Sequence, residues 1–239
     1  MKFQIFSDLH LELRDSYPNI TPCCDILVLA GDIGHIDCEM YREFIAYCST
    51  QWKHVIYVLG NHEFYDTTRS YSEMMTVYKR FFLTFRNVYL LDCEVLVLED
   101  VFFFGATMFT SALPEFLEAR IKNFDVRAVS FDQFMKLDSF LQHHQRQHKV
   151  IITHYPITRE LECINEKYYD QSELRHKYFC NDYLHMFSYN FLRKVACVIS
   201  GHTHESYDFV SKYKNVRCIA NQYGYPRDSN VLRDILIEM

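Results

Sequence analysis

The 239-residue sequence has only six glycines and five prolines, and no stretch rich in glycine, proline or serine that would separate two domains. It also lacks an apolar run long enough to cross a membrane, and the segment from Met1 to Phe6 is too short and too polar for a signal peptide. These absences predict a single domain over residues 1–239. We expect it to be soluble and cytoplasmic, with no membrane partner.

A basic surface and paired cysteines are lacking as well. The formal net charge is −6, and because proteins that track along nucleic acid rely on basic surfaces, we expect no stable nucleic-acid polymer as partner. The nine cysteines are scattered, and Cys23 and Cys24 are adjacent and lack the spacing of a thiolate metal site. This usage is typical of reduced, mostly buried cysteines in an intracellular protein.

The clearest positive pattern is an apolar strand that stops at a glycine and is followed by polar side chains. The segment from His54 to Leu59 ends at Gly60, and Asn61, His62 and Glu63 come directly after it. Open α/β sheets usually place their chemistry at the carboxyl ends of strands, where loops carry ligands while the strands stay rigid. The pattern therefore predicts a functional site at this strand end.

Four more predicted strands end in carboxylates or imidazoles. These strands are Lys2 to Phe6, Asp25 to Ala30, Val150 to Thr153 and Val195 to Ile199. The polar residues that follow all five strands are Asp8, His10, Asp32, Asn61, His154, His202 and His204. Each has a simpler interpretation when it is taken alone: Asp8 and His10 could lie in a solvated loop, and Asp32 could cap the helix that follows.

As a set, these seven residues favour a metal centre. Carboxylates, neutral imidazoles and an amide, without a thiolate, suit Mn²⁺, Fe²⁺ or Zn²⁺. Seven ligands are too many for one tetrahedral site but suit two metals that share one carboxylate. Such a pair clamps the oxygens of a phosphoryl group and turns a bridging water into hydroxide near neutral pH. His62 is then an imidazole left over for catalysis.

The rest of the chain predicts helices and short strands around this site. Apolar residues at helical spacing predict helices around Tyr41 to Cys48, Tyr71 to Phe85 and Phe131 to Leu141. Short strands are predicted at Val88 to Leu91, Val95 to Leu98 and Val101 to Phe104. We expect these three strands to form an antiparallel continuation of the sheet.

The ordered motifs resemble those of the calcineurin-like metallophosphoesterase superfamily, and in particular its small stand-alone members. The matching blocks are Asp8-x-His10, Gly31-Asp32, Gly60-Asn61-His62-Glu63, His154 and Gly201-His202-x-His204. The resemblance implies an α/β fold of two packed mixed β-sheets flanked by helices.

The resemblance also implies a division of the ligands. One metal would be held by Asp8, His10 and His204, and the other by Asn61, His154 and His202. Asp32 would bridge both ions, for which Mn²⁺ is preferred over Fe²⁺ or Zn²⁺.

The implied activity is hydrolysis of a phosphoester by a metal-bridging hydroxide. His62 would lie beside the scissile phosphate and act as an acid or transition-state stabiliser, or else orient a ligand from behind. Glu63 is expected to hold a neighbouring backbone or imidazole group and not to act as a base.

Two departures from the family pattern bear on the substrate. Protein phosphatases of the superfamily carry an arginine soon after the Gly-Asp block and another just before Gly-Asn-His, whereas this chain has Gly34, His35 and Leu59 in those stretches. Since a phosphomonoester dianion needs more cationic grip than a diester monoanion, we expect a small nucleotide-like or lipid-derived phosphodiester. A phosphomonoesterase, a nuclease and a non-catalytic protein-binding scaffold stay open, as does the oligomeric state.

Candidate substrate contacts are fewer and less specific. Arg127, Tyr155 and Arg227, with Arg159, lie near ligand-bearing segments, although an isolated arginine is more often simply solvated. Residues 156–191 insert a tyrosine-rich stretch between two ligand strands. This insertion could be an aromatic cap that stacks a nucleobase, or a helical lid packed on the domain.

Overall fold

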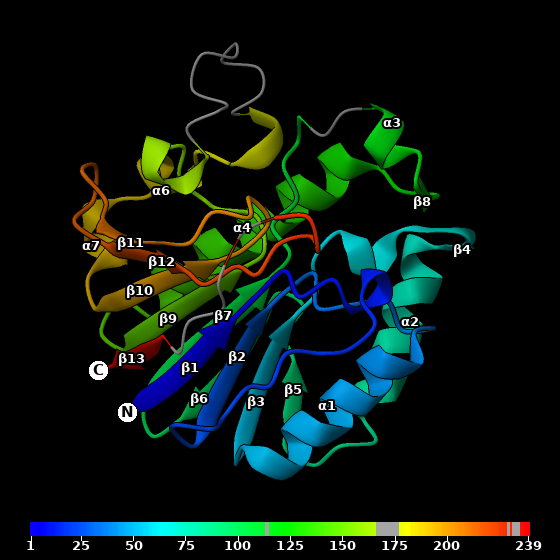
Figure 1. The fold of residues 1–239 in the computed structure, drawn as a ribbon. Coiled ribbons are helices and arrows are strands. Elements are labelled where there is room, and N and C mark those ends of the chain that lie inside the picture. The colour runs from blue at the N-terminus through cyan, green and yellow to red at the C-terminus, as the bar shows by residue number, and fades with distance from the viewer. Residues whose placement is uncertain (113–114, 166–176, 229, 231–234) are drawn as a thin grey trace.

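The computed structural model describes residues 1–112, 115–165, 177–228, 230 and 235–239. Two β-sheets pack face to face (Figure 1). The first sheet has the order β13 (Leu236–Glu238), β1 (Lys2–Phe6), β2 (Ile26–Ala30), β3 (His54–Val58) and β5 (Val88–Leu90). The second has the order β11 (Tyr207–Val210), β12 (Arg217–Ala220), β10 (Val195–Ser200), β9 (His148–Thr153), β7 (Val101–Ala106) and β6 (Glu94–Leu98).

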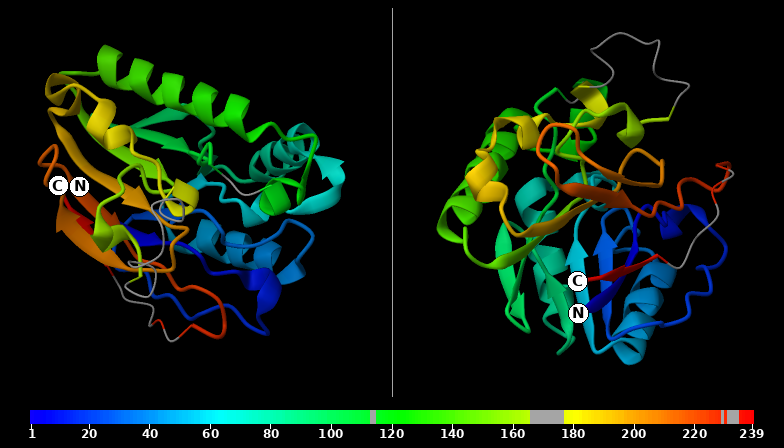
Figure 2. Two further views of the ribbon diagram at one scale, coloured as in Figure 1. Left: turned by 90° about the horizontal axis from the view of Figure 1, so that it is seen from above. Right: turned by 90° about the vertical axis from the view of Figure 1, so that its left-hand side faces the viewer.

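Helices cover the outer faces of both sheets. The helices α1 (Glu39–Gln51) and α2 (Tyr71–Phe82) lie on the first sheet, and α4 (Val126–His143) and α7 (Tyr189–Leu192) lie on the second (Figures 1 and 2). The shorter elements are η1 (Leu11–Leu13), η2 (His62–Phe64), η3 (Leu161–Cys163), α3 (Glu115–Glu118) and α6 (Tyr183–Met186), and a small sheet pairs β4 (Asp66–Ser70) with β8 (Ile121–Lys122). The predicted fold of two mixed sheets flanked by helices is confirmed.

Strand β2 shows how the sequence dictates these layers. Its side chains alternate between the two faces of the sheet, as in any extended chain. Ile26 and Val28 pack into the core between the sheets, whereas Leu27 and Leu29 pack against the helices. Both faces are buried, which is why this strand appears in the sequence as a continuous apolar run.

The strand order explains why the polar motifs converge. Strands β1, β2 and β3 are parallel neighbours in the first sheet, and β9 and β10 are parallel neighbours in the second. Carboxyl ends of parallel strands meet at one edge of a sheet, and here the edges of the two sheets face each other. Residues far apart in sequence therefore reach one place.

The predicted antiparallel continuation is wrong for part of its length. Strand β5 pairs parallel with β3 in the first sheet, whereas β6 and β7 form an antiparallel hairpin in the second. The hairpin turn places Glu99 and Asp100 at φ 46° and 66°, the left-handed values that a tight two-residue turn requires. Short strands carry no signal for which sheet they join, since that depends on distant partners.

The chain ends lie side by side. Strand β13 pairs antiparallel with β1, and the Met1 amino group donates to the Met239 carbonyl oxygen at 3.0 Å (Figure 2). A parallel bridge between Ser7 and Gln222 also brings the segment after β12 to the end of β1. This second contact delivers C-terminal residues to the site.

All nine cysteines are free, and five of them are buried. In the described part of the chain, no helix has the length and the apolar character that a membrane crossing requires.

The insertion at residues 156–191 begins and ends against the domain. Asn181 N donates to the Pro156 carbonyl at 2.8 Å, and Asn181 Nδ2 donates to the Met108 carbonyl at 2.7 Å. The Tyr183 hydroxyl hydrogen-bonds the Ser130 hydroxyl on α4 at 2.7 Å. The Tyr183 ring packs against Phe134 of the same helix. The tyrosines at 168 and 169 lie outside the described residues, and the role of the insertion as a cap or lid stays a prediction.

Candidate active site

All seven predicted metal ligands meet at the facing carboxyl ends of the strands. Three overlapping groups form there, in each of which one nitrogen or oxygen atom per residue lies within 4.8 Å of the others. One of them joins His10, Asp32 and His62, and the other two are the clusters described next. The first cluster contains Asp8, His10 and His204, and the second contains Asp32, His154 and His202. Helix α1 has Cys38 at its N-cap, so the alternative that Asp32 caps this helix does not hold.

In the first cluster, the ring nitrogens face one another. His10 Nε2 lies 3.0 Å from His204 Nε2, which is 3.7 Å from Asp8 Oδ1. The other ring nitrogen of His204, Nδ1, lies 2.8 Å from the Asp228 carboxylate. A carboxylate partner there fixes the tautomer so that the Nε2 lone pair faces the cluster, as it does in imidazoles that bind metal.

In the second cluster, the hydrogen-bonding roles of the side chains indicate whether a cation fits between them. His154 Nδ1 is 3.0 Å from the Ala30 carbonyl oxygen, to which it must donate, so in the neutral ring Nε2 carries no proton. Nε2 nevertheless lies 3.0 Å from Asn61 Oδ1 and 3.3 Å from Asp32 Oδ1. Asn61 Nδ2 donates to Tyr65, which leaves its oxygen facing His154. Three hydrogen-bond acceptors that face one another repel, and a positive charge between them would remove that repulsion.

The electrostatics around Asp32 show the same demand for positive charge, which a proton on His154 or a bound cation would meet. Burial alone would lower the pKa of His154, but the charge of Asp32 and the hydrogen bond to it raise that pKa to about 9. Burial would likewise raise the pKa of Asp32, yet the charges of His154 and His62 hold it well below its usual range. The site thus favours a carboxylate surrounded by positive charge, and the residues present fit two divalent cations.

Asp32 stands between the clusters. Its Oδ1 faces His154, whereas Oδ2 lies 3.9 Å from His10 Nε2 in the first cluster. The backbone N–H of His62 also donates to Oδ1 at 2.8 Å. One oxygen directed at each cluster is the arrangement that a bridging carboxylate needs.

The local backbone is built for close approach. Five of the seven ligands have left-handed φ angles between 46° and 74°: Asp8, His10, Asp32, His202 and His204. Non-glycine residues avoid this region, and such strain gathers at functional sites. Gly31, at φ 85°, also lets two strands meet, since a Cβ there would lie 2.5 Å from His154 Nδ1.

Glu63 supports this backbone, as expected. Its carboxylate accepts hydrogen bonds from four groups: the backbone N–H of Asp32, Ile33 and Gly60, and the Tyr57 hydroxyl. Burial and the charge of Asp32 raise the pKa of Glu63 to about 7, while the donated hydrogen bonds favour its ionised form. Glu63 therefore ties the loop after β2 to the loop after β3.

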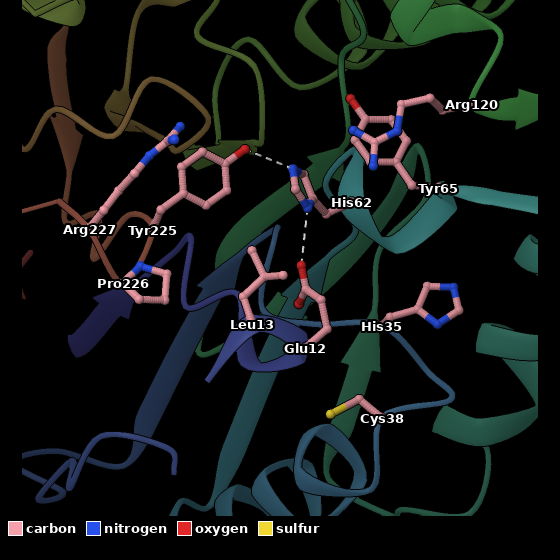
Figure 3. Close-up of a pocket in the computed structure, with 10 residues that line it drawn as sticks. All are labelled: Glu12, Leu13, His35, Cys38, His62, Tyr65, Arg120, Tyr225, Pro226 and Arg227. Carbon is pink, nitrogen blue, oxygen red and sulfur yellow. Dashed lines mark hydrogen bonds and ion pairs between the residues drawn. The ribbon is translucent and has the colours of Figure 1, made fainter. Parts of the chain in front are cut away.

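His62 lies beside the clusters with both ring nitrogens engaged (Figure 3). Nδ1 is 3.1 Å from Glu12 Oε1, and Nε2 is 3.1 Å from the Tyr225 hydroxyl. Burial would lower the pKa of His62, but the charges of Asp32 and Glu12 raise it. Burial would raise the pKa of Glu12, but its contacts with His10 and His62 lower it to about 2. This imidazole is held in one orientation and favours the protonated state.

A cavity of about 680 Å³ opens next to His62. Its lining residues are Glu12, Leu13, His35, Cys38, His62, Tyr65, Arg120, Tyr225, Pro226 and Arg227 (Figure 3). Ligand pockets commonly have volumes of roughly 300–1,000 Å³, so this one has room for more than a single phosphate.

Of the predicted substrate contacts, Arg227 lines this cavity and the others do not. Arg127 is exposed on the first turn of α4, and Arg159 donates to the Cys180 carbonyl within the insertion. Tyr155 is fully buried, and its ring centroid lies 3.8 Å from that of His202. Tyr155 therefore supports a ligand from behind and does not face the cavity.

Several residues of the site were not predicted from the sequence. Glu12 could have been found, since it extends Asp8-x-His10 by one more alternate position. Tyr65, Arg120 and Asp228 have no such local signal, because they reach the site only through the tertiary fold.

The comparisons with known proteins agree with this geometry. A family model described as calcineurin-like phosphoesterase matches residues 1–206. The chain belongs to this family. An uncharacterized protein of Acanthamoeba polyphaga mimivirus is 23% identical over 261 residues, which cover 94% of this chain and 91% of that protein. The crystal structure of the phosphopantetheinyl hydrolase of Mycobacterium tuberculosis aligns with a TM-score of 0.64 and 18% identity, over 95% of this chain and 90% of that one.

The residues that the family model matches do not include the whole candidate site. Tyr225, Arg227 and Asp228 all follow residue 206, yet Tyr225 contacts His62 and Asp228 contacts His204. The C-terminal segment therefore completes a site whose ligands come from the family region.

Proposed function

We propose that the protein is a dinuclear-metal-dependent phosphodiesterase that acts on a small nucleotide-like or lipid-derived diester. The observation that carries the proposal is the meeting of the seven predicted nitrogen and oxygen ligands, with Asp32 between the two clusters and His62 directly beside them. Membership of the calcineurin-like phosphoesterase family supports phosphoester hydrolysis as the reaction.

The ligand division follows the two clusters. Asp8, His10 and His204 would hold one ion, and Asn61, His154 and His202 the other, with Asp32 between them. Two divalent ions bound there, Mn²⁺ in our proposal, would polarise the phosphoryl oxygens and make a water molecule nucleophilic near neutral pH.

His62 supplies the proton chemistry. Its Nε2 contacts the hydroxyl of Tyr225, a residue that lines the cavity, and a leaving oxygen could take the place of that hydroxyl. Glu12 on Nδ1 holds the ring in position and stabilises its protonated form. The imidazolium can then give its Nε2 proton to the departing alkoxide.

The preference for a diester rests on the motif positions and on the cavity. Leu59, which stands where the protein phosphatases of the superfamily have an arginine, is 2% exposed and cannot grip a phosphate. The cavity walls include Leu13, Tyr65, Tyr225 and Pro226, which suit an organic arm on each side of the phosphorus. The nine free cysteines favour a reducing compartment such as the cytoplasm.

A phosphomonoesterase is the second candidate, because Arg120 and Arg227 line the same cavity and could grip a dianion. The deciding experiment compares hydrolysis of bis(p-nitrophenyl) phosphate with that of p-nitrophenyl phosphate, using chelated protein reconstituted separately with Mn²⁺, Fe²⁺ and Zn²⁺. We expect metal-dependent turnover that is faster on the diester. Faster turnover of the monoester would favour the second candidate, and hydrolysis of neither compound by protein holding two ions would favour a non-catalytic scaffold.

A further inference from the structure

Tyr65 contacts a predicted metal ligand and lines the cavity at the same time. Asn61 Nδ2 donates to the Tyr65 hydroxyl oxygen at 2.9 Å, and the Tyr65 side chain forms part of the cavity wall. The ring centroids of Tyr65 and His62 lie 4.8 Å apart, and Figure 3 shows the two rings next to each other. Tyr65 therefore stands between the ligand cluster and the space in which a substrate would bind.

The position of the Tyr65 ring is fixed from two sides. The Arg120 guanidinium lies over one face of the ring, 4.0 Å from its centroid. The Tyr65 backbone N–H donates to the His62 carbonyl oxygen at 3.2 Å, which closes the short helix η2 that carries His62. Because one short turn holds both residues, the Tyr65 hydroxyl has a set place relative to His62.

The hydrogen-bonding roles of Asn61 decide those of Tyr65. Asn61 Oδ1 faces His154 Nε2 at 3.0 Å, so the amide group that reaches Tyr65 is the NH₂, which can only donate. The Tyr65 oxygen is then the acceptor, and its own hydrogen is left for another partner. Among the described residues, Asn61 is the only hydrogen-bond partner of this hydroxyl. The Tyr65 O–H is therefore available to an acceptor inside the cavity.

A substrate oxygen would come within reach of this hydrogen. Metal–oxygen bonds are about 2 Å long, so two oxygen atoms on one ion lie within about 4 Å of each other. A phosphoryl oxygen that shares an ion with Asn61 Oδ1 is thus close to the Asn61 amide, and the Tyr65 oxygen is 2.9 Å from the nitrogen of that amide. Phosphoryl oxygens carry negative charge and are strong acceptors.

We propose that Tyr65 is a further catalytic residue, whose O–H donates a hydrogen bond to a non-bridging oxygen of the scissile phosphate. This inference rests on the proposed function and adds a substrate contact to the same site. The proton stays on Tyr65 throughout, because His62 supplies the proton that the leaving oxygen takes. A neutral donor suits a phosphodiester, whose phosphate carries a single negative charge.

The test compares two variants that each lose one hydroxyl. Tyr65→Phe keeps the ring that packs beside His62 and under Arg120. Inorganic phosphate, titrated calorimetrically into Mn²⁺-loaded protein, should bind about tenfold more weakly to this variant, the size of one hydrogen bond to a charged group. Tyr223→Phe is the matched control and should bind phosphate as the wild type does. Its ring also lies under a guanidinium, that of Arg14 at 4.1 Å, but it does not line the cavity.

Metal content separates a substrate contact from support of Asn61. The phosphate titrations are run at saturating Mn²⁺, with two ions per chain verified by elemental analysis, and the tenfold loss in Tyr65→Phe should persist there. Equal phosphate binding by wild type and Tyr65→Phe, each holding two ions, overturns the inference. A loss that disappears once high Mn²⁺ restores the second ion also overturns it, since Tyr65 would then act only through Asn61.

Turnover distinguishes this inference from the proposed function. On bis(p-nitrophenyl) phosphate, Tyr65→Phe should show a kcat/KM about tenfold below that of the wild type and of Tyr223→Phe. Diester hydrolysis at equal rates in all three proteins would leave the phosphodiesterase proposal standing and reject the Tyr65 contact. Absence of hydrolysis, combined with phosphate binding that requires the Tyr65 hydroxyl, would reject the enzyme proposal and support the contact with phosphate.

Discussion

The ligand cluster and the cavity wall of this protein are built in different ways. The seven predicted ligands lie at the ends of five parallel-paired strands, and five of them are buried. The cavity wall, formed by Tyr65, Arg120, Tyr225 and Arg227, comes from loops and is partly exposed. Rigid strand ends suit a metal centre whose geometry must not vary, whereas loops can vary the substrate without disturbing it.

The largest effect should come from the residue that joins both clusters. Asp32→Asn removes a charge directed at each one, so we expect activity to fall by about 1,000-fold or more and metal content to drop below two ions per chain. Activity assays and elemental analysis check both effects. Asp37→Asn, which changes an exposed carboxylate paired with Arg69, is the matched control and should keep two ions. A fully metallated, active Asp32→Asn variant would contradict the bridging role.

His62→Ala should separate chemistry from metal binding. Loss of the proton donor should lower kcat by about 10²- to 10⁴-fold on diesters with poor leaving groups such as alcohols, and less with p-nitrophenol, while both ions remain bound. Rates measured over a series of leaving groups test this directly. An equal loss for every leaving group would place His62 in a supporting position behind the ligands.

Gly60→Ala tests how tightly the strand ends must approach. A Cβ at Gly60 would collide with the backbone N and the Oδ1 of Asp32, so we expect Asp32 to shift and activity to fall by about 100-fold. Gly34→Ala is the control, because its Cβ would lie 3.1 Å or more from its neighbours and should cost much less. Similar activity in the two variants would show that the close approach is not required.

The smallest effect should come from the segment beyond residue 206. Asp228 orients His204 through Nδ1 and also accepts from the Tyr225 backbone N–H at 2.8 Å. Asp228→Asn should weaken binding of one of the two ions by about 10- to 100-fold, the usual cost of losing such a partner. Titration of apoprotein with Mn²⁺ should show this loss at one site only. Unchanged affinity would remove the C-terminal segment from the metal centre.

These two regions also differ in how far the sequence predicts them. Asp8, Asp32 and His154 were predicted because each follows an apolar run, and parallel pairing makes such ends converge. Arg120 and Tyr225 were missed, because their place beside His62 depends on loop paths that no local pattern encodes. Strand β13 was missed for a similar reason: three residues form a strand only because β1 offers them an edge.

The most direct test of a dinuclear centre around Asp32 is a crystal structure of the Mn²⁺-reconstituted protein with anomalous scattering data collected at the manganese edge. A bridging Asp32 predicts two anomalous peaks that flank its carboxylate. One should be bounded by Asp8, His10 and His204, and the other by Asn61, His154 and His202. A single peak, or two peaks that do not share Asp32, would contradict it.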